Sequence, residues 1–304
     1  MKASLNSNFA LRPLSLIIIF VVVFLLGCAR EEEVIPTSTP PKKDVEVTKN
    51  ISYSTGEFKE QTLDLYLPTG YEGPYPTILM IHQGNGNKEQ LLSWGHALAK
   101  IGYASISINH RQWPEYSYPD HLEDAFCALA WIYDNSAVYS FDTQNIYALG
   151  HSAGGTLAAI LGVIDQTDAF TLNCPDSLPE EGRLQGVITF TGIFDYPSIL
   201  IEAPELEDYV TDLLGGNQVD IPEIWNGASA STWVDGSEPP FLIIHGEGDH
   251  SIPPDQSRSF ADLLENSGVE VELILVPGAS HTQIAGLAQS LETVELFLKN
   301  LIKR

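Results

Sequence analysis

The chain has 304 residues and is strongly acidic, with 40 Asp and Glu against 15 Lys and Arg and a formal net charge of −25 at pH 7. A charge of this size repels polyanions, so it argues strongly against nucleic-acid binding and polyanionic substrates. A solvated acidic surface explains the charge without any cationic partner. No Cys/His spacing is typical of zinc and no glycine-rich loop is typical of phosphate binding, so we expect neither metal nor cofactor.

The first 27 residues are predicted to be a leader. Lys2 and Arg12 are basic, and the apolar run at 14–26 is shorter than the roughly 20 residues that a membrane-spanning helix needs. It ends in Leu-Leu-Gly-Cys, which resembles the lipobox of bacterial lipoproteins. The resemblance implies cleavage before Cys28, a lipid on Cys28 and an extracytoplasmic, membrane-anchored protein. An uncleaved signal anchor or an ordinary secretory peptide are the alternatives.

Residues 28–44 have few core-forming side chains, and we expect a disordered tether there. The remaining residues, 45–304, fit one large α/β domain. Its first two strands, at 45–54 and 61–67, are expected to form a hairpin-like start.

Further strands then alternate with helical stretches, which predicts a mostly parallel sheet of about eight strands with helices on both faces. These strands are centred near Ile78, Ile106, Ile146, Val187, Leu242 and Leu273. The alternation is interrupted at 194–240, where proline-rich turns surround an acidic helix near 205–214.

Ser152 is the candidate nucleophile. It lies in Gly-His-Ser-Ala-Gly at 150–154, between a predicted buried strand at 145–149 and a helix rich in Ala and Leu at 155–163. A serine on a sharp strand-to-helix turn is presented above the sheet, and the flanking glycines permit that turn. A G-x-S-x-G pattern also occurs by chance, but its position between a strand and a helix favours the nucleophile interpretation.

His281 is the candidate base and Asp249 the acid that orients it, in the chain order Ser, Asp, His. Each follows a predicted strand, so each lies at the carboxyl edge of the sheet. Alternatively, Asp249 only caps a turn, and Glu247 or Asp255 is the acid that orients the base. The competing bases are His82, His245 and His250.

These residues resemble the α/β-hydrolase superfamily and its carboxylesterase/lipase branch. Other matching segments are His-Gly-Glu-Gly-Asp at 245–249 and Asn-His-Arg-Gln-Trp-Pro-Glu at 109–115. The second is similar to the Tyr-Arg-Leu-Ala-Pro-Glu segment of hormone-sensitive-lipase-like and acetyl- or feruloyl-esterase-like members. The resemblance covers 45–304, implies a cofactor-free serine ester hydrolase, and places a lid at 194–240.

The oxyanion hole departs from the His-Gly-Gly-Gly pattern of such esterases, because His82 is followed by Gln-Gly-Asn at 83–85. The backbone N–H of Ala153 is one expected donor by its position. The second is expected from Gly84 or Asn85, with Gln83 as a weaker candidate, and each donor contributes roughly 3 kcal/mol. The alternative is a polar loop without this role.

Cys127 and Cys174 remain after Cys28. An exported compartment is oxidising, which favours a disulfide between them, although two unpaired buried thiols are the alternative.

The combined prediction is a membrane-anchored serine carboxylesterase that acts on small, short-chain acyl esters. A serine exopeptidase on the same fold and a non-catalytic binding protein that kept the fold are the alternatives.

Overall fold

The computed structural model describes residues 44–55, 58–164, 174–176, 178–179, 182–286 and 288–302. The predicted leader, Cys28 and the tether up to residue 43 lie outside these residues. Within the described ranges, no helix is long and apolar enough to cross a membrane.

The described strands form one sheet in the order β1-β2-β4-β3-β5-β6-β7-β8. Their bounds are Asp44–Ser52 (β1), Thr62–Thr69 (β2), Tyr75–Ile81 (β3), Ala104–Ile108 (β4), Phe141–His151 (β5), Gly186–Phe190 (β6), Phe241–Gly246 (β7) and Val271–Val276 (β8). β2 is antiparallel to both β1 and β4, and all other neighbours are parallel. This confirms the predicted fold class, the hairpin-like start and the mostly parallel sheet.

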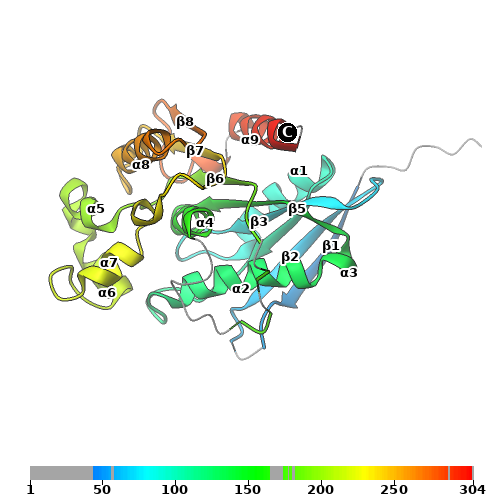
Figure 1. The fold of residues 1–304 in the computed structure, drawn as a ribbon, viewed down its shortest axis with the longest axis horizontal. Helices are drawn as coiled ribbons and strands as arrows, with labels where there is room; N and C mark the ends of the chain where they lie inside the picture. The colour runs from blue at the N-terminus through cyan, green and yellow to red at the C-terminus, as the bar shows by residue number, and fades with distance from the viewer. Residues whose placement is uncertain are drawn as a thin grey trace, which may run out of the picture. The chain divides into compact units, whose positions relative to one another are not determined.

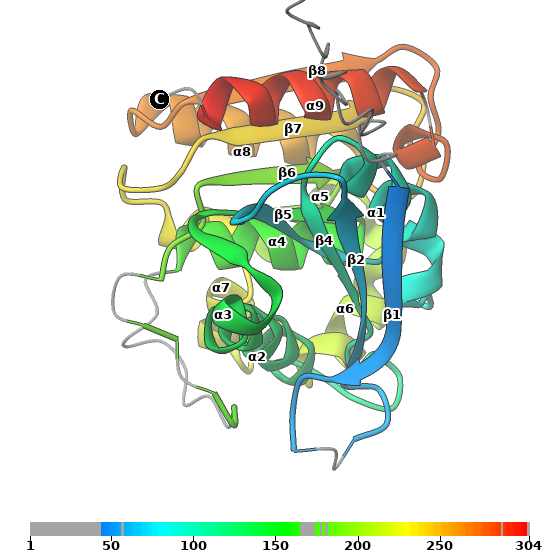
Figure 2. The same ribbon diagram turned by 90° about the vertical axis from the view of Figure 1, so that its right-hand side faces the viewer.

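Helices cover both faces of the sheet (Figures 1 and 2). Two hydrophobic cores result because alternate strand residues point to opposite faces. The helix bounds are Leu92–Lys100 (α1), Asp120–Asp134 (α2), Ser136–Tyr139 (α3), Ala153–Val163 (α4), Pro254–Asn266 (α8) and Ala288–Ile302 (α9). Leu79 and Ile81 of β3 belong to the core under α2, α4 and α8, whereas Ile78 and Met80 belong to the core under α1 and α9. Burial on both faces explains why the parallel strands are almost continuously apolar.

An insertion joins β6 to β7 and coincides with the interruption predicted at 194–240. It contains α5 (Tyr196–Glu202), α6 (Glu207–Leu214) and α7 (Pro222–Gly227), which lie together in Figure 1. Its side chains form a third core around the fully buried Trp225, whose indole N–H donates to the Gly216 carbonyl at 3.0 Å. The insertion therefore packs largely on itself.

The predicted disulfide is present between Cys127 of α2 and Cys174, which follows α4 in the chain. Their Cα atoms are 5.1 Å apart and the bridge closes a span of 47 residues. The disulfide therefore links α2, which precedes β5, to the segment that follows α4.

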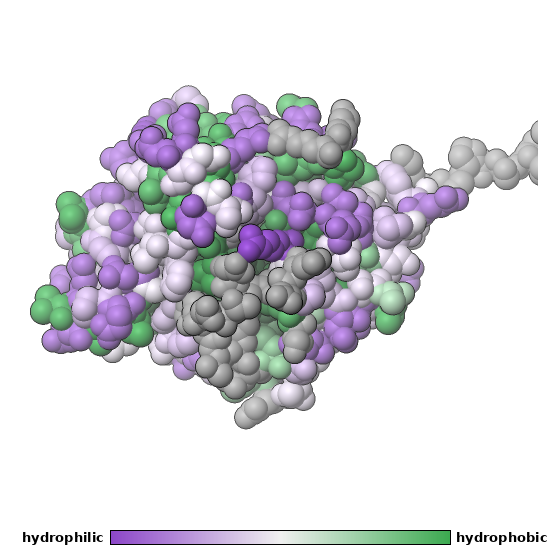
Figure 3. All heavy atoms as spheres, viewed as in Figure 1, coloured by the Kyte–Doolittle hydropathy of each residue, from purple (hydrophilic) through white to green (hydrophobic). Residues whose placement is uncertain are grey.

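Hydrophilic and intermediate residues cover most of the coloured surface in Figure 3, with isolated hydrophobic spots. Two of the most exposed aliphatic side chains, Ile201 and Val219, belong to the insertion.

Candidate active site

Ser152 occupies the sharp turn between β5 and α4. Its φ of 56° and ψ of −118° are unusual for a residue with a side chain, which marks a locally strained backbone. The Ser152 N–H donates to the Phe190 carbonyl of β6 at 2.9 Å, so the neighbouring strand holds the turn. A Cβ atom on Gly150 would collide with the Gly154 carbonyl, which explains why this turn needs glycine.

The structure brings Ser152, His281 and Asp249 together from three separate loops. His281 Nε2 lies 2.9 Å from Ser152 Oγ, and His281 Nδ1 lies 2.8 Å from Asp249 Oδ2. The Asp249 side chain is fully buried, and that of His281 is 16% exposed. This arrangement allows His281 to accept the serine proton while Asp249 holds the imidazole orientation.

Asp249 is held by its own loop as well as by His281. Its Oδ1 accepts the N–H groups of Ser251 at 2.8 Å and Ile252 at 3.0 Å, and His245 Nε2 lies 3.3 Å from Oδ2. Burial alone would raise the pKa of Asp249. The hydrogen bonds from His245 and His281 outweigh burial and hold this pKa well below its ordinary value. Asp249 is therefore ionised at neutral pH and can stabilise an imidazolium.

The alternative acids do not take this position. Glu247 and Asp255 are exposed, and both contact Arg258, at 3.7 Å and 2.9 Å.

The alternative bases have other contacts or lie on the surface. His245 Nδ1 is 2.6 Å from Ser257 Oγ and its Nε2 is 3.0 Å from the Ile252 carbonyl, so it supports the Asp249 loop. His82 is buried with Nδ1 2.7 Å from the Gln83 carbonyl, and burial lowers its pKa to about 3. His250 is exposed.

His151 supports the His281 loop, a role that the sequence did not suggest. Its Nε2 is 2.9 Å from the His281 carbonyl, which can only accept a hydrogen bond. Burial lowers the pKa of His151 to about 4, so the ring is neutral at neutral pH and carries its proton on Nε2. The residue before the nucleophile therefore fixes the backbone of the candidate base. The only sequence signal was its place inside the G-x-S-x-G pattern.

The residues predicted for the oxyanion hole lie beside Ser152. Gln83, Gly84, Asn85 and Ala153 all line the cavity that contains Ser152. A Cβ atom on Gly84 would be 3.7 Å from that of Ala153, and Asn85 adopts the left-handed conformation with a φ of 55°. Which N–H group acts as the second donor stays a prediction.

A buried ion pair anchors the chain just after this loop. Lys88 is 4% exposed, and its Nζ lies 3.1 Å from Asp64 of β2 and 2.7 Å from Asn50 Oδ1. The Lys88 N–H donates to Asn109 Oδ1 at 2.7 Å, which connects the loop to the end of β4. This ion pair was not predicted from the sequence. Its faint signal is one aspartate inside the apolar strand Leu-Asp-Leu.

The cavity in front of Ser152 has a volume of about 340 Å³. Its apolar wall combines the helix that follows the nucleophile with the insertion, through Leu157, Ile193, Tyr196, Leu206, Tyr209 and Leu213. Trp113 meets Tyr209 edge to face, with ring centroids 5.3 Å apart. The insertion thus forms a wall of the site.

Among the residues that the structure describes, no cluster of three His, Cys, Asp or Glu side chains could hold a metal ion.

The fold and the site agree with the similarity of the chain to known proteins. The α/β-hydrolase fold is shared with a truncated carbohydrate esterase from gut microbiota, at a TM-score of 0.74 and 26% identity over 86% of this chain and 98% of that one. The BD-FAE family model matches residues 63–264, so the chain belongs to the BD-FAE family.

Curated relatives include esterase LipQ of Mycobacterium tuberculosis, 28% identical over 80% of this chain and 58% of the relative. A probable isoprenylcysteine alpha-carbonyl methylesterase of Arabidopsis thaliana is 28% identical over 78% of this chain and 51% of the relative. The chain therefore spans between half and three-fifths of the length of these two relatives.

Proposed function

We propose that the protein is a serine carboxylesterase that hydrolyses short-chain acyl esters. The observation that carries this proposal is the hydrogen-bonded chain from Ser152 Oγ through His281 to Asp249, at 2.9 Å and 2.8 Å. Ser152 and His281 line a cavity. The esterase names of relatives such as LipQ support the same reaction class.

In the proposed mechanism, His281 Nε2 takes the Ser152 proton while Oγ attacks the ester carbonyl carbon. The imidazolium is stabilised by the buried, ionised carboxylate of Asp249, and it then returns the proton to the leaving alcohol. Water attacks the resulting acyl-enzyme with His281 again as base, which releases the acid and regenerates Ser152.

The carbonyl oxygen becomes negative in both steps. We assign the backbone N–H of Ala153 as one donor to it and that of Gly84 or Asn85 as the second. All three residues lie in the wall of the cavity beside Ser152.

The size and lining of the cavity support a small acyl group. Its volume of about 340 Å³ is near the lower end of ordinary ligand sites, which run from roughly 300 to 1,000 Å³. The aliphatic and aromatic side chains of α4 and the insertion offer an acyl chain an apolar environment.

Replacement of Ser152 by alanine tests the reaction. Ser152→Ala should abolish labelling by a fluorophosphonate probe and lower kcat for p-nitrophenyl butyrate by about 10⁴-fold or more, because the three residues act as a unit. Ser251 also lines the cavity, and Ser251→Ala is the matched control that should still be labelled. Full turnover by Ser152→Ala would remove the assignment.

We also propose that a lipid on Cys28 anchors the protein to the outside of a bacterial membrane. The supporting observation is the Leu-Leu-Gly-Cys sequence that ends the apolar run. The full chain should incorporate labelled palmitate in an expressing bacterium and Cys28→Ser should not, and labelling that survives this change would contradict the anchor.

A further inference from the structure

One corner of the cavity in front of Ser152 is polar. His110, Gln112 and His121 line it, in contrast to the apolar wall formed by α4 and the insertion. Three side-chain atoms there are buried without a hydrogen-bond partner, namely His110 Nε2, Gln112 Oε1 and His121 Nδ1. The proposed ester hydrolysis uses none of these atoms.

His110 Nε2 is a hydrogen-bond acceptor. His110 Nδ1 lies 2.9 Å from the Arg111 carbonyl, which can only accept, so the proton of the neutral ring is on Nδ1. Burial lowers the pKa of His110, and the residue is only 2% exposed, so the ring is neutral at neutral pH. Its Nε2 therefore carries a lone pair.

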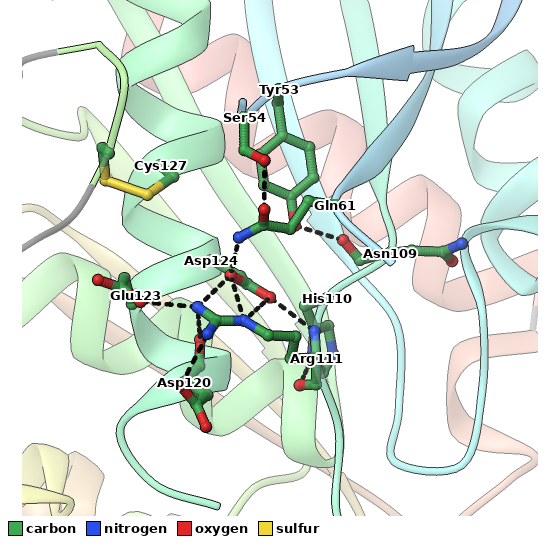
Figure 4. Close-up of polar contacts among 11 residues, drawn as sticks. Tyr53, Ser54, Gln61, Asn109, His110, Arg111, Asp120, Glu123, Asp124 and Cys127 are labelled. Atoms are coloured by element: carbon green, nitrogen blue, oxygen red, sulfur yellow. Dashed lines mark hydrogen bonds and ion pairs between the residues drawn. A yellow bond between two sulfur atoms is a disulfide. The ribbon is translucent and has the colours of Figure 1, made fainter. Parts of the chain in front are cut away.

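The position of His110 is fixed by the residue that follows it. Figure 4 shows the Arg111 guanidinium among three carboxylates of α2, each with an oxygen 2.7 Å from it: Asp120, Glu123 and Asp124. The Arg111 N–H also donates to Asp124 Oδ2 at 2.6 Å. Because both the side chain and the backbone of Arg111 are held, the carbonyl that sets the His110 tautomer cannot move away easily.

Gln112 is arranged in the same way. Its Nε2 donates to the Gly86 carbonyl at 3.1 Å, so its Oε1 is left as the buried acceptor. His121 adds a further ring nitrogen without a partner, and burial lowers its pKa to about 3, so this ring is also neutral at neutral pH. Gln112 and His110 both direct their donor atoms to backbone carbonyls and retain an acceptor.

Buried acceptors without partners carry a free-energy cost. Leaving such a group unsatisfied destabilises the folded protein, and a ligand that brings a donor removes this cost. A hydroxyl group supplies one donor in a small volume, whereas an alkyl or ether group supplies none. The polar corner therefore favours ligands that carry a hydrogen-bond donor over ligands that carry none.

The sheet order shows which part of an ester this corner faces. Asp249 and His281 follow β7 and β8 on one side of β5, while residues 109–121 follow β4 on the other side. His281 has to reach the oxygen of the leaving alcohol, so the alcohol lies on its side of Ser152. The acyl group then extends from Ser152 past the apolar wall toward His110 and Gln112, which line the same cavity.

We propose that His110 and Gln112, with His121 beside them, form a subsite that selects acyl groups carrying a hydroxyl. The hydroxyl hydrogen would bond to His110 Nε2 or Gln112 Oε1, which leaves the ester carbonyl free to occupy the oxyanion hole. This subsite rests on the proposed esterase function and adds the substrate class to it.

The test compares matched esters with the wild-type enzyme. The p-nitrophenyl esters of 3-hydroxybutyrate and 3-methoxybutyrate differ in one donor, and a 6-hydroxyhexanoate and 6-methoxyhexanoate pair samples a longer reach. At least one hydroxy ester should show a kcat/KM about 10-fold or more above its methoxy partner. Equal values in both pairs, or faster turnover of the methoxy ester in both, would overturn the subsite.

Gln112→Leu has nearly the same volume and lacks the acceptor, so it should lower the hydroxy-to-methoxy ratio severalfold. Gln289→Leu makes the same change at an exposed position of α9 outside the cavity lining, and this matched control should leave the ratio within twofold. An unchanged ratio in folded Gln112→Leu would show that Gln112 does not contribute to the subsite. Turnover of p-nitrophenyl butyrate that depends on Ser152 would keep the esterase proposal intact even if every hydroxyl comparison failed.

Discussion

The catalytic edge of the sheet and the insertion between β6 and β7 contribute to the same cavity but are held in different ways. Ser152, Asp249 and His281 each follow a strand of the sheet and are fixed by backbone hydrogen bonds and neighbouring rings. The insertion packs around Trp225 in a third core, which it shares with few residues from elsewhere, among them Ile252 of the Asp249 loop. The chemistry thus belongs to the rigid edge, while the shape of the apolar wall depends on a separately packed segment.

The largest effect should come from Asp249→Asn, which acts only on the catalytic edge. We expect kcat for p-nitrophenyl butyrate to fall by about 10⁴-fold, because an amide neither stabilises the imidazolium nor fixes the required tautomer. Glu247→Gln and Asp255→Asn remove nearby exposed carboxylates and serve as controls that retain most activity. If either control lost as much activity as Asp249→Asn, the acid would be wrongly assigned.

Trp225→Ala should destabilise the insertion but leave the sheet folded. Truncation of a fully buried aromatic side chain costs about 3–5 kcal/mol. Hydrogen exchange should accelerate in α5, α6 and α7 while β5 and β7 stay protected, because these elements belong to different cores. Leu242→Ala, in the sheet core, is the comparison that should weaken protection throughout. Equal loss of protection in both variants would show that the insertion and the sheet unfold as one unit.

The disulfide should stabilise the scaffold without affecting the chemistry. Cys127→Ala should lower the free energy of unfolding by about 2–4 kcal/mol, because the bridge restricts a span of 47 residues in the unfolded chain. Esterase activity at room temperature should change little. A reductant should lower the melting temperature of the wild type but not that of the Cys127→Ala, Cys174→Ala double variant, and identical responses would argue against the bridge.

The most gradual effect, spread over several pH units, concerns acid. His82, His121 and His151 have pKa values lowered to about 3, 3 and 4 by burial, whereas an unfolded histidine binds a proton near pH 6.5. Between about pH 6.5 and 4 the unfolded chain therefore holds more protons, and stability must fall as the pH falls, by up to about 1.4 kcal/mol per pH unit for each histidine. The lowered pKa of Asp249 affects the free energy of unfolding only below about pH 4, because an unfolded aspartate titrates near that value.

His151→Gln tests this assignment. The amide can still donate to the His281 carbonyl but does not titrate, so the dependence of the unfolding free energy on pH between 6.5 and 4 should become shallower. The side chain of His250 is exposed, so His250→Gln is the control and should leave that dependence unchanged. The same slope in His151→Gln and the wild type would remove His151 from the explanation.

The sequence by itself determined the fold and the positions of the candidate catalytic residues. Alternating apolar segments predicted the strands because parallel strands are buried on both faces, and the G-x-S-x-G pattern between a strand and a helix located Ser152. His281 and Asp249 followed from their places after strands, since the carboxyl ends of parallel strands meet at one edge.

The tertiary structure alone decided which groups support that edge and what lines the cavity. His151 contacts the His281 backbone across 130 positions of the chain, and Lys88 reaches Asp64 from another strand. The unpartnered acceptors of His110 and Gln112 arise because the His110 ring faces the Arg111 carbonyl and the Gln112 amide donates to the Gly86 carbonyl. Such contacts depend on distance, tautomer and burial, and no residue pattern along the chain encodes those quantities, so they could only be found once the chain was folded.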